Sequence, residues 1–82
     1  MDEYVQAVMR HAVYEVDSDG SAYGSVTVTP DLVVSASART QRQCIRALQQ
    51  NVQHAVETAL HDSRALPSID GIAPPRSTGY AA

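Results

Sequence analysis

The most constraining feature of this sequence is a helix N-terminal cap that opens a long amphipathic segment. Thr40 and Gln43 form a Thr-x-x-Gln capping box, whose side chains bond free amide groups of the first helical turn. Apolar residues then recur every three or four positions: Cys44, Ile45, Leu48, Val52, Ala55, Val56, Ala59 and Leu60. This spacing predicts one helix of about six turns, which Pro67 is expected to stop.

The apolar stripe also predicts which residues of this helix are buried. Five apolar positions are expected to lie against a sheet: Ile45, Leu48, Val52, Val56 and Leu60. Three polar positions between them are expected to stay exposed: Gln49, Gln53 and Glu57. The strands that would cover the stripe precede the helix in the sequence.

Three segments before the helix have the composition and patterning of β-strands: residues 12–16, 22–29 and 32–37. The first alternates strictly, with Tyr14 and Glu15 on opposite faces. Turn-forming residues fill positions 17–21, where Gly20 can take a positive φ at little cost, so a hairpin is expected between the first two strands. Pro30 ends the second strand.

The two ends of the chain carry weaker patterns. Residues 2–11 have helical spacing after two acidic residues, which suit a helix N-terminus, and they predict a short helix. Leu66–Ile72 is interpreted as a short return strand. Residues 73–82 are expected to form a flexible tail, which leaves residues 1–72 as one domain.

Composition limits the size of the core. In 82 residues there is no Trp, no Phe and only four Tyr, so the core must be built from smaller apolar side chains, and a core shared between subunits is expected. A lone cysteine and an acidic start at Met1–Glu3, without the features of a signal peptide, predict a cytoplasmic protein. No apolar run approaches the length of a membrane span, so no membrane role is expected.

Charge is distributed unevenly along the chain. Residues 1–31 carry six acidic residues against Arg10, which gives −5, while the remainder carries five arginines against three acidic residues, which gives +2 and so the net −3. An acidic N-terminal part disfavours nucleic acid as the main partner and suits a basic protein. The candidate partner-binding residues are Glu15, Asp17 and Asp19.

Basic residues gather around the start of the long helix. Arg39, Arg42 and Arg46 are spaced i, i+3 and i+7, so they form a ridge. One interpretation is a solvated face that needs no partner. The other is a docking surface for acidic groups of a second subunit, with Arg42 and Arg46 as the candidate oligomer interface.

Candidate metal and catalytic groups have simpler structural interpretations. His54, Glu57 and His61 share one helical stripe, but no further protein ligand is evident, so no metal site is expected. The acidic turn at residues 17–20 resembles the opening of a calcium loop, but its glycine comes two positions early, which favours a hairpin turn. No cofactor is expected.

Nucleophiles and paired carboxylates are equally weak signals. Cys44 lies on the apolar stripe, which favours a buried, inert thiol over a reactive one. Glu15 and Asp17 share one strand face, but no other strand supplies an acid beside them. His11 has no evident Ser or Cys partner. The protein is therefore expected not to be an enzyme.

The order of these features resembles the HicB-like antitoxins of toxin–antitoxin systems from Tyr4 to about Ile72. The matching segments are Tyr4-Val5-Gln6-Ala7, Ala12-Val13-Tyr14-Glu15, Asp19-Gly20, Tyr23-Gly24, Pro30-Asp31-Leu32, Thr40 with Cys44, and Leu66-Pro67-Ser68-Ile69-Asp70-Gly71. The resemblance implies an α+β fold in which a three-stranded antiparallel sheet is packed by one long helix and extended by a short fourth strand. This is an incomplete ribonuclease-H-like arrangement, here preceded by a short N-terminal helix.

Three features differ from that family. Val33 and Val34 stand where members usually carry a Pro-Gly pair. Residues 41–43 are Gln-Arg-Gln where members carry acids. Only ten residues follow Ile72, where many such antitoxins carry a DNA-binding domain, so direct DNA binding is not expected.

Two functions follow from these observations. The resemblance implies a homo-oligomeric, non-enzymatic protein that neutralises a HicA-like toxin, a small basic messenger-RNA-cleaving protein, by covering its active site. The alternative is an orphan homo-oligomeric scaffold or small-ligand-binding domain without a toxin partner. The missing acids at residues 41–43 favour this alternative.

Overall fold

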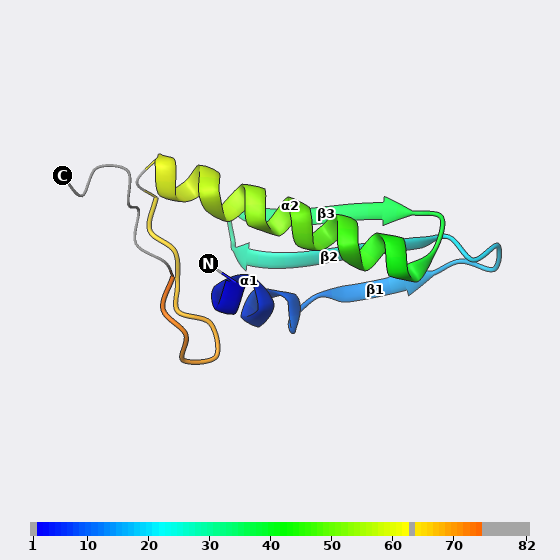
Figure 1. Ribbon diagram of the computed structural model, residues 1–82, viewed down its shortest axis with the longest axis horizontal. Helices are drawn as coiled ribbons and strands as arrows, with labels where there is room; N and C mark the ends of the chain where they lie inside the picture. The colour runs from blue at the N-terminus through cyan, green and yellow to red at the C-terminus, as the bar shows by residue number, and fades with distance from the viewer. Residues whose placement is uncertain (1, 63, 75–82) are drawn as a thin grey trace.

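The computed structural model describes residues 2–62 and 64–74 and has two layers, a helical layer over one face of a sheet (Figure 1). The elements in chain order are α1 (Asp2–Met9), β1 (Val13–Val16), β2 (Ala22–Thr29), β3 (Leu32–Ala38) and α2 (Gln41–His61). The three strands are antiparallel and lie in the order β1-β2-β3. The predicted α+β fold, with a short helix, a three-stranded sheet and a long helix, is confirmed.

Helix α2 begins where its capping residue predicts. Thr40 is extended, and its Oγ1 accepts a hydrogen bond from the Gln43 amide at 3.1 Å. The helix ends at His61, before Pro67 is reached. There the Arg64 amide donates to the Ala59 carbonyl at 2.8 Å, the six-to-one bond of a Schellman-type cap. A local hydrogen bond therefore ends the helix, and the expectation that Pro67 stops it was wrong.

The buried face of α2 is narrower than predicted. Its buried residues follow one line at three- and four-residue spacing: Cys44, Leu48, Val52, Val56 and Ala59. Ile45 was expected in this set but is 39% exposed, and Leu60 is only half-buried. One residue step turns a helix by about 100°, so Ile45 lies at the margin of a stripe centred on Cys44 and Leu48. Gln49, Gln53 and Glu57 are exposed as predicted.

The sheet presents alternate residues of β2 to the helical layer. Ala22, Gly24, Val26 and Val28 are buried, while the residues between them are half-buried or exposed. Four residues of β1 pair with β2, whereas β3 pairs along nearly the whole length of β2. The end of β2 therefore extends beyond β1.

Helix α1 lies beside α2, beyond the start of β1 (Figure 1). Its buried residues pack against both α2 and β2: Tyr4, Val5, Ala7 and Val8. The hydroxyl of Tyr4 donates to the carbonyl of Pro67 at 2.7 Å, so the helix is also tied to the segment that follows α2. The helix is two residues shorter than predicted, because Arg10 and His11 form a turn.

The short fourth strand predicted at Leu66–Ile72 is not formed. Instead, Ile69 and Ile72 pair with each other through two backbone hydrogen bonds of 2.9 and 2.8 Å. Between them Asp70 and Gly71 both have positive φ, of 52° and 80°. An Asp-Gly pair with this geometry is typical of a two-residue hairpin turn, so the segment bonds to itself and not to the sheet.

The other face of the sheet is not covered by any of the described elements. Val13, Tyr23 and Val33 on this face are 65%, 49% and 60% exposed. Within the described residues, no helix is both long and apolar enough to cross a membrane. Of the predicted tail, residues 73–82, all but the first two lie outside the described part of the chain.

Candidate protein-binding surfaces

The predicted acidic surface lies on the β1–β2 hairpin. Its turn is closed by hydrogen bonds from the Asp17 amide to Ser21 and from the Gly20 amide to Asp17. The carboxylate of Asp19 accepts bonds from the Ser21 hydroxyl at 2.7 Å and the Ser21 amide at 2.9 Å. These bonds to Ser21 hold the pKa of Asp19 below its usual value. The tip therefore carries a negative charge in a defined position.

Glu15 extends this acidic surface onto the open face of the sheet. It lies on β1 directly opposite Tyr23 of β2, and both side chains are exposed. Asp17 and Asp19 are exposed as well. The structure thus brings the three predicted acidic residues to one end of the molecule, beside an exposed aromatic ring.

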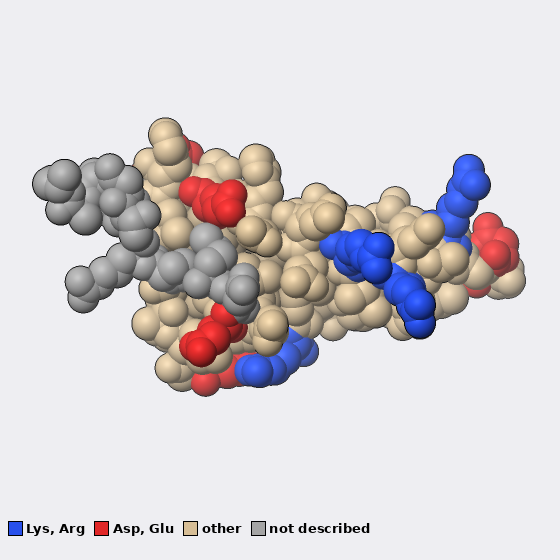
Figure 2. Space-filling model, in the orientation of Figure 1, with Lys and Arg blue, Asp and Glu red and all other residues tan. Residues whose placement is uncertain are grey.

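The predicted basic surface lies at the same end. Arg42 and Arg46 are exposed on the first turns of α2, and Arg39 precedes the cap. Figure 2 shows basic side chains over this part of α2, with acidic side chains at the far tip of the same end. Ion pairs among the described residues involve only Arg10, the histidines at 11 and 61, and two aspartates, so these three arginines have no ionic partner there.

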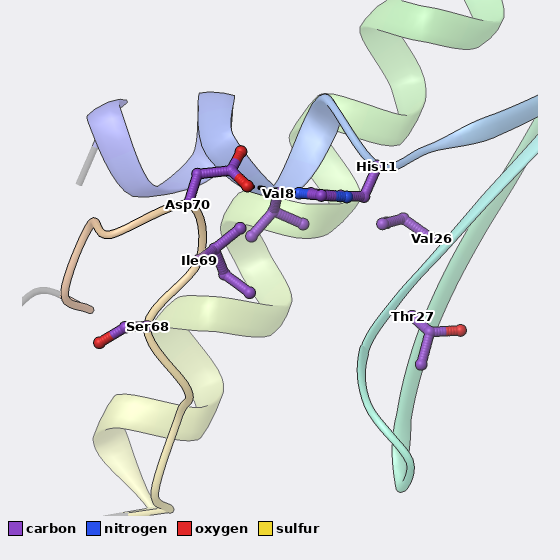
Figure 3. Close-up of a pocket in the computed structure, with 7 residues that line it drawn as sticks. All are labelled: Val8, His11, Val26, Thr27, Ser68, Ile69 and Asp70. Atoms are coloured by element: carbon purple, nitrogen blue, oxygen red, sulfur yellow. Dashed lines mark hydrogen bonds and ion pairs between the residues drawn. The ribbon is translucent and has the colours of Figure 1, made fainter.

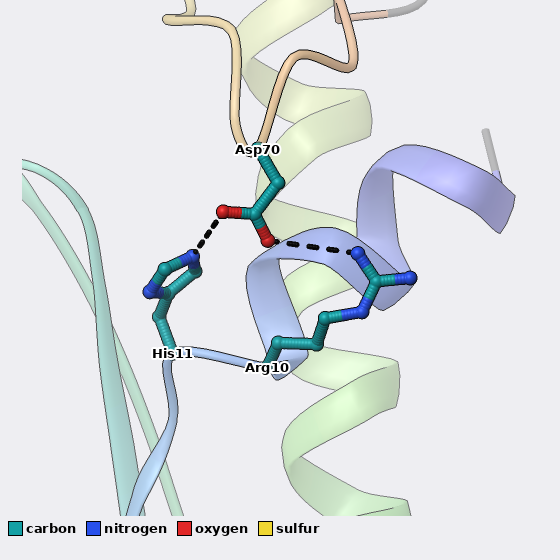
Figure 4. A network of polar contacts seen from close by, with 3 residues as sticks. All are labelled: Arg10, His11 and Asp70. Atoms are coloured by element: carbon teal, nitrogen blue, oxygen red, sulfur yellow. Dashed lines mark hydrogen bonds and ion pairs between the residues drawn. The ribbon is translucent and has the colours of Figure 1, made fainter.

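A third polar cluster, at the opposite end of the sheet, was not predicted from the sequence. One carboxylate oxygen of Asp70 lies 2.9 Å from Nε2 of His11, and the other lies 3.5 Å from Nη1 of Arg10 (Figure 4). The contact with His11, followed by that with Arg10, lowers the pKa of Asp70. His11 and Asp70 are 59 positions apart in the sequence, and no local spacing could have predicted the contact.

This cluster borders a shallow cavity of about 330 Å³ (Figure 3). The cavity is lined by Val8, His11, Val26, Thr27, Ser68, Ile69 and Asp70. Asp70 could orient the His11 ring as in a hydrolase, but the Ser68 side chain points away from that ring. The Ser68 hydroxyl is therefore not placed beside this base, and the contacts of Asp70 with Arg10 and His11 connect the end of α1 to the hairpin at residues 69–72.

The other candidate chemical groups are dispersed or buried. His54, Glu57 and His61 line a depression of about 310 Å³ along one helix. Seven residues of helix separate the two histidines by about 10 Å, which is too far for one metal ion. Within the described residues, no three His, Cys, Asp or Glu side chains are grouped so as to hold a metal. Cys44 is buried, with its Sγ 3.6 Å from the carbonyl oxygen of Ala36.

Comparison with known proteins identifies the family. The model of the UPF0150-like family matches residues 3–67, which include all three strands, the whole of α2 and all of α1 except Asp2. The chain belongs to the UPF0150-like family. The match ends at Pro67, so the family region contains the acidic hairpin and the arginines of α2 but not Asp70.

One solved structure has the same fold as this UPF0150-like chain. The crystal structure of TTHA0281 from Thermus thermophilus has a TM-score of 0.72 and 22% sequence identity, and the match covers 87% of this chain and 86% of that one. At this identity the likeness concerns the fold alone. No curated protein matches the chain.

Proposed function

We propose that this protein is a HicB-like antitoxin that neutralises a small basic HicA-like toxin by covering its active site. Membership of the UPF0150-like family, which is related to the HicB-like antitoxins, carries the proposal. The action is non-enzymatic. Because the toxin cleaves messenger RNA, we infer that both proteins meet in the cytoplasm.

The acidic hairpin supports a cationic partner. Glu15, Asp17 and Asp19 are exposed at one end of the molecule, and Ser21 holds the carboxylate of Asp19 in place. A negative surface that is already ordered attracts a basic protein without the entropy cost of ordering it.

The open face of the sheet supplies the contact area that masking requires. Tyr23 is exposed next to Glu15, and Val13 and Val33 are exposed on the flanking strands. Exposed aromatic and aliphatic groups beside ordered charges are typical of protein interfaces. A toxin bound across this face would have its own surface buried without any reaction by the antitoxin.

Co-expression with the protein encoded next door tests the proposal. The wild-type chain should copurify with that protein and rescue growth. A triple variant, Glu15→Gln with Asp17→Asn and Asp19→Asn, should associate more slowly, because it has lost the attraction that guides encounter. A double variant at the other end of α2, Glu57→Gln with Asp62→Asn, is the control. If both partners are folded and the wild-type chain does not copurify with the neighbouring protein and does not rescue growth, the antitoxin function is contradicted.

An orphan homo-oligomeric scaffold or small-ligand-binding domain is the second candidate, and the cavity beside His11 and Asp70 favours it. Its volume of about 330 Å³ is at the small end of the range for ligand pockets, and it combines three aliphatic side chains with a His–Asp pair. In this case toxin binding would be absent and a small molecule would raise the midpoint of thermal unfolding.

A further inference from the structure

We propose that the cavity beside His11 and Asp70 binds a short extended peptide, which pairs with the backbone of Thr27 as an added strand. The site is separate from the acidic hairpin and does not depend on the antitoxin function. A peptide is the ligand class for the cavity of about 330 Å³ that favours the second candidate function. The backbone groups that would bind it belong to β2, where β1 leaves them without a partner.

Strand β1 pairs with only part of β2. The pairing ends with Val13 opposite Ser25, and residues 26–29 of β2 continue past it. The chain leaves the ladder before Val13, because the amides of His11 and Ala12 donate to carbonyls of the last turn of α1 at 3.0 and 3.1 Å. No described strand therefore pairs with this edge of β2 beyond Ser25.

The hydrogen-bond pattern shows which backbone groups face this open edge. The amide of Asp17 donates to the carbonyl of Ser21 at 2.8 Å, so these two residues form a hydrogen-bonded pair at the closed end of the hairpin. Such pairs alternate with non-bonded ones in an antiparallel ladder. Every second residue of β2 after Ser21, including Ser25 and Thr27, therefore directs its N–H and C=O groups to the β1 side. Ser25 is opposite Val13, whereas Thr27 has no residue of β1 opposite it.

The amide and carbonyl of Thr27 are thus available to a further strand. Among the described residues, no backbone hydrogen bond outside the sheet ladder uses them. In the ladder with β3, the alternation assigns the bonds to the adjacent Val26, which is opposite Val34. The N–H and C=O of one extended residue match the donor and the acceptor of Thr27. Addition of an extended segment to a free sheet edge is a common mode of peptide recognition.

The cavity lies at this open edge (Figure 3). Val26 and Thr27 line one side and residues 68–70 line another, and Val8 of α1 adds to the lining. Val8 and Val26 are buried and Ile69 is half-buried, so this part of the cavity is aliphatic. In an extended peptide, the residues on either side of the one opposite Thr27 point to the sheet face on which Val26 lies. Aliphatic side chains at these two positions would fit the cavity.

The polar end of the cavity adds a hydrogen-bond acceptor. Nε2 of His11 lies 2.9 Å from the carboxylate of Asp70, and this contact lowers the pKa of Asp70. Because a carboxylate only accepts, Nε2 carries the proton, and Nδ1 of the neutral ring accepts. Figure 4 shows Nδ1 on the side of the ring turned towards the strands. Asp70 is already paired with Arg10 and His11, so an uncharged peptide that donates a backbone N–H suits this end.

Nuclear magnetic resonance on the full chain tests the site with a defined probe, acetyl-Val-Ser-Val-amide. Its serine would pair with Thr27, and its two valines would point to the side of Val26. In a titration to about 10 millimolar, the Thr27 amide signal should shift and saturate. At ten times the dissociation constant, exchange of this amide with solvent should slow about tenfold, because only about a tenth of the sites remain free.

Two further probes separate strand pairing from simple filling of an apolar cavity. The same peptide methylated on the serine nitrogen lacks the N–H that the Thr27 carbonyl would accept, so its dissociation constant should be about tenfold higher or more. Equal binding of the two peptides would overturn the pairing. Isoamyl alcohol is apolar and has no amide. If it binds as tightly as the peptide, the cavity takes small apolar molecules and the peptide proposal is overturned.

A substitution in the protein gives the complementary test. Thr27→Pro removes the amide that would donate to the peptide, and the sheet should persist because this amide does not bond to β3. Peptide binding should fall about tenfold or more, and undiminished binding by the folded variant would overturn the pairing. Gln50→Ala, exposed on α2, is the control and should bind as the wild type does. If Thr27→Pro does not fold, the two peptides compared on the wild type decide.

The outcome for the wild type is independent of the proposed antitoxin function. The titration contains no toxin, so a failure of the peptide to bind leaves the copurification and growth-rescue results unaffected. A wild-type chain in which the Thr27 amide shows no saturable shift and no slower exchange would overturn the peptide site.

Discussion

At Gly24 the ring of Tyr14 occupies the space that a side chain would need. An added Cβ would lie 2.8 Å from Cδ1 and Cε1 of Tyr14 and 3.3 Å from Sγ of Cys44. Tyr14 is directly opposite Gly24 in the β1–β2 pairing. The glycine therefore lets an aromatic ring lie across the middle strand, where it covers part of a core that contains no Phe or Trp.

The change Gly24→Ala should destabilise the protein by about 1–3 kcal/mol, because the methyl group forces the ring or the helix to move. Chemical denaturation measures this loss. The exposed Ser37→Ala is the control. In a Tyr14→Ala background the alanine at position 24 should cost less, and an equal cost in both backgrounds would show that the ring is not the cause.

The change Asp70→Asn should reduce stability at neutral pH and not in acid. The pKa of Asp70 is lowered in the folded protein, so its contribution is present above the unfolded pKa, of about 4, and is lost as the pH falls through the lower folded value. Asparagine tolerates the positive φ of this position, so the change removes the charge and leaves the turn intact. Unfolding free energies of both proteins from pH 2 to pH 7 should converge at the acid end. A constant difference, or the same profile for the control Asp31→Asn, would contradict the role of Asp70.

At the scale of elements, α2 organises the molecule. It contacts α1, β2 and β3, and its buried line runs from Cys44 to Ala59. The side-chain amide of Asn51 donates a hydrogen bond of 3.0 Å to the backbone carbonyl of Ser35, on the edge strand β3. The helix thus fills the core and also donates one hydrogen bond to a backbone carbonyl of the edge strand.

Two substitutions on α2 measure the width of its buried face. Leu48→Ala should cost about 2–5 kcal/mol, because the side chain is fully buried and its removal leaves a cavity. Ile45→Ala should cost about 1 kcal/mol or less, because the side chain is already partly in water. Chemical denaturation of both variants gives the comparison. A loss below about 0.5 kcal/mol for Leu48→Ala, or equal losses for the two, would place the core elsewhere.

At the scale of the whole molecule, charge is separated along the sequence but brought together at one end of the fold. The acidic hairpin and the arginines of α2 lie at the same end (Figure 1), while Asp70 contacts Arg10 where the segment after α2 passes α1 (Figure 4). This distribution favours contacts with other proteins through the hairpin end. The contacts of Asp70 with Arg10 and His11 instead connect α1 to the segment that follows α2.

Association with a basic partner should weaken as salt rises. Exposed charges are screened within about 10 Å at roughly 0.1 M ionic strength, and the hairpin carboxylates are exposed. Stopped-flow measurements at two salt concentrations should show a fall in the association rate with a smaller change in the dissociation rate. An association rate that does not depend on salt would exclude the hairpin as the guiding surface.

The sequence by itself determined the elements that depend on local patterns. The Thr40 cap, the helix after it, the span of β2 and the turn around Gly20 follow from capping, periodicity and backbone freedom, each of which acts within a few residues. The candidate charges could also be named in advance, because charge is a property of residue type.

Only the tertiary structure decided which of these residues meet. The short β1 and the narrow buried stripe left Val16 and Ile45 exposed, and the self-paired hairpin at Ile69–Ile72 took the place of a fourth strand. The contact of His11 with Asp70 joins residues 59 positions apart. Such contacts depend on how whole elements pack against one another, because packing sums many small interactions across the molecule, and no short window of sequence contains that sum.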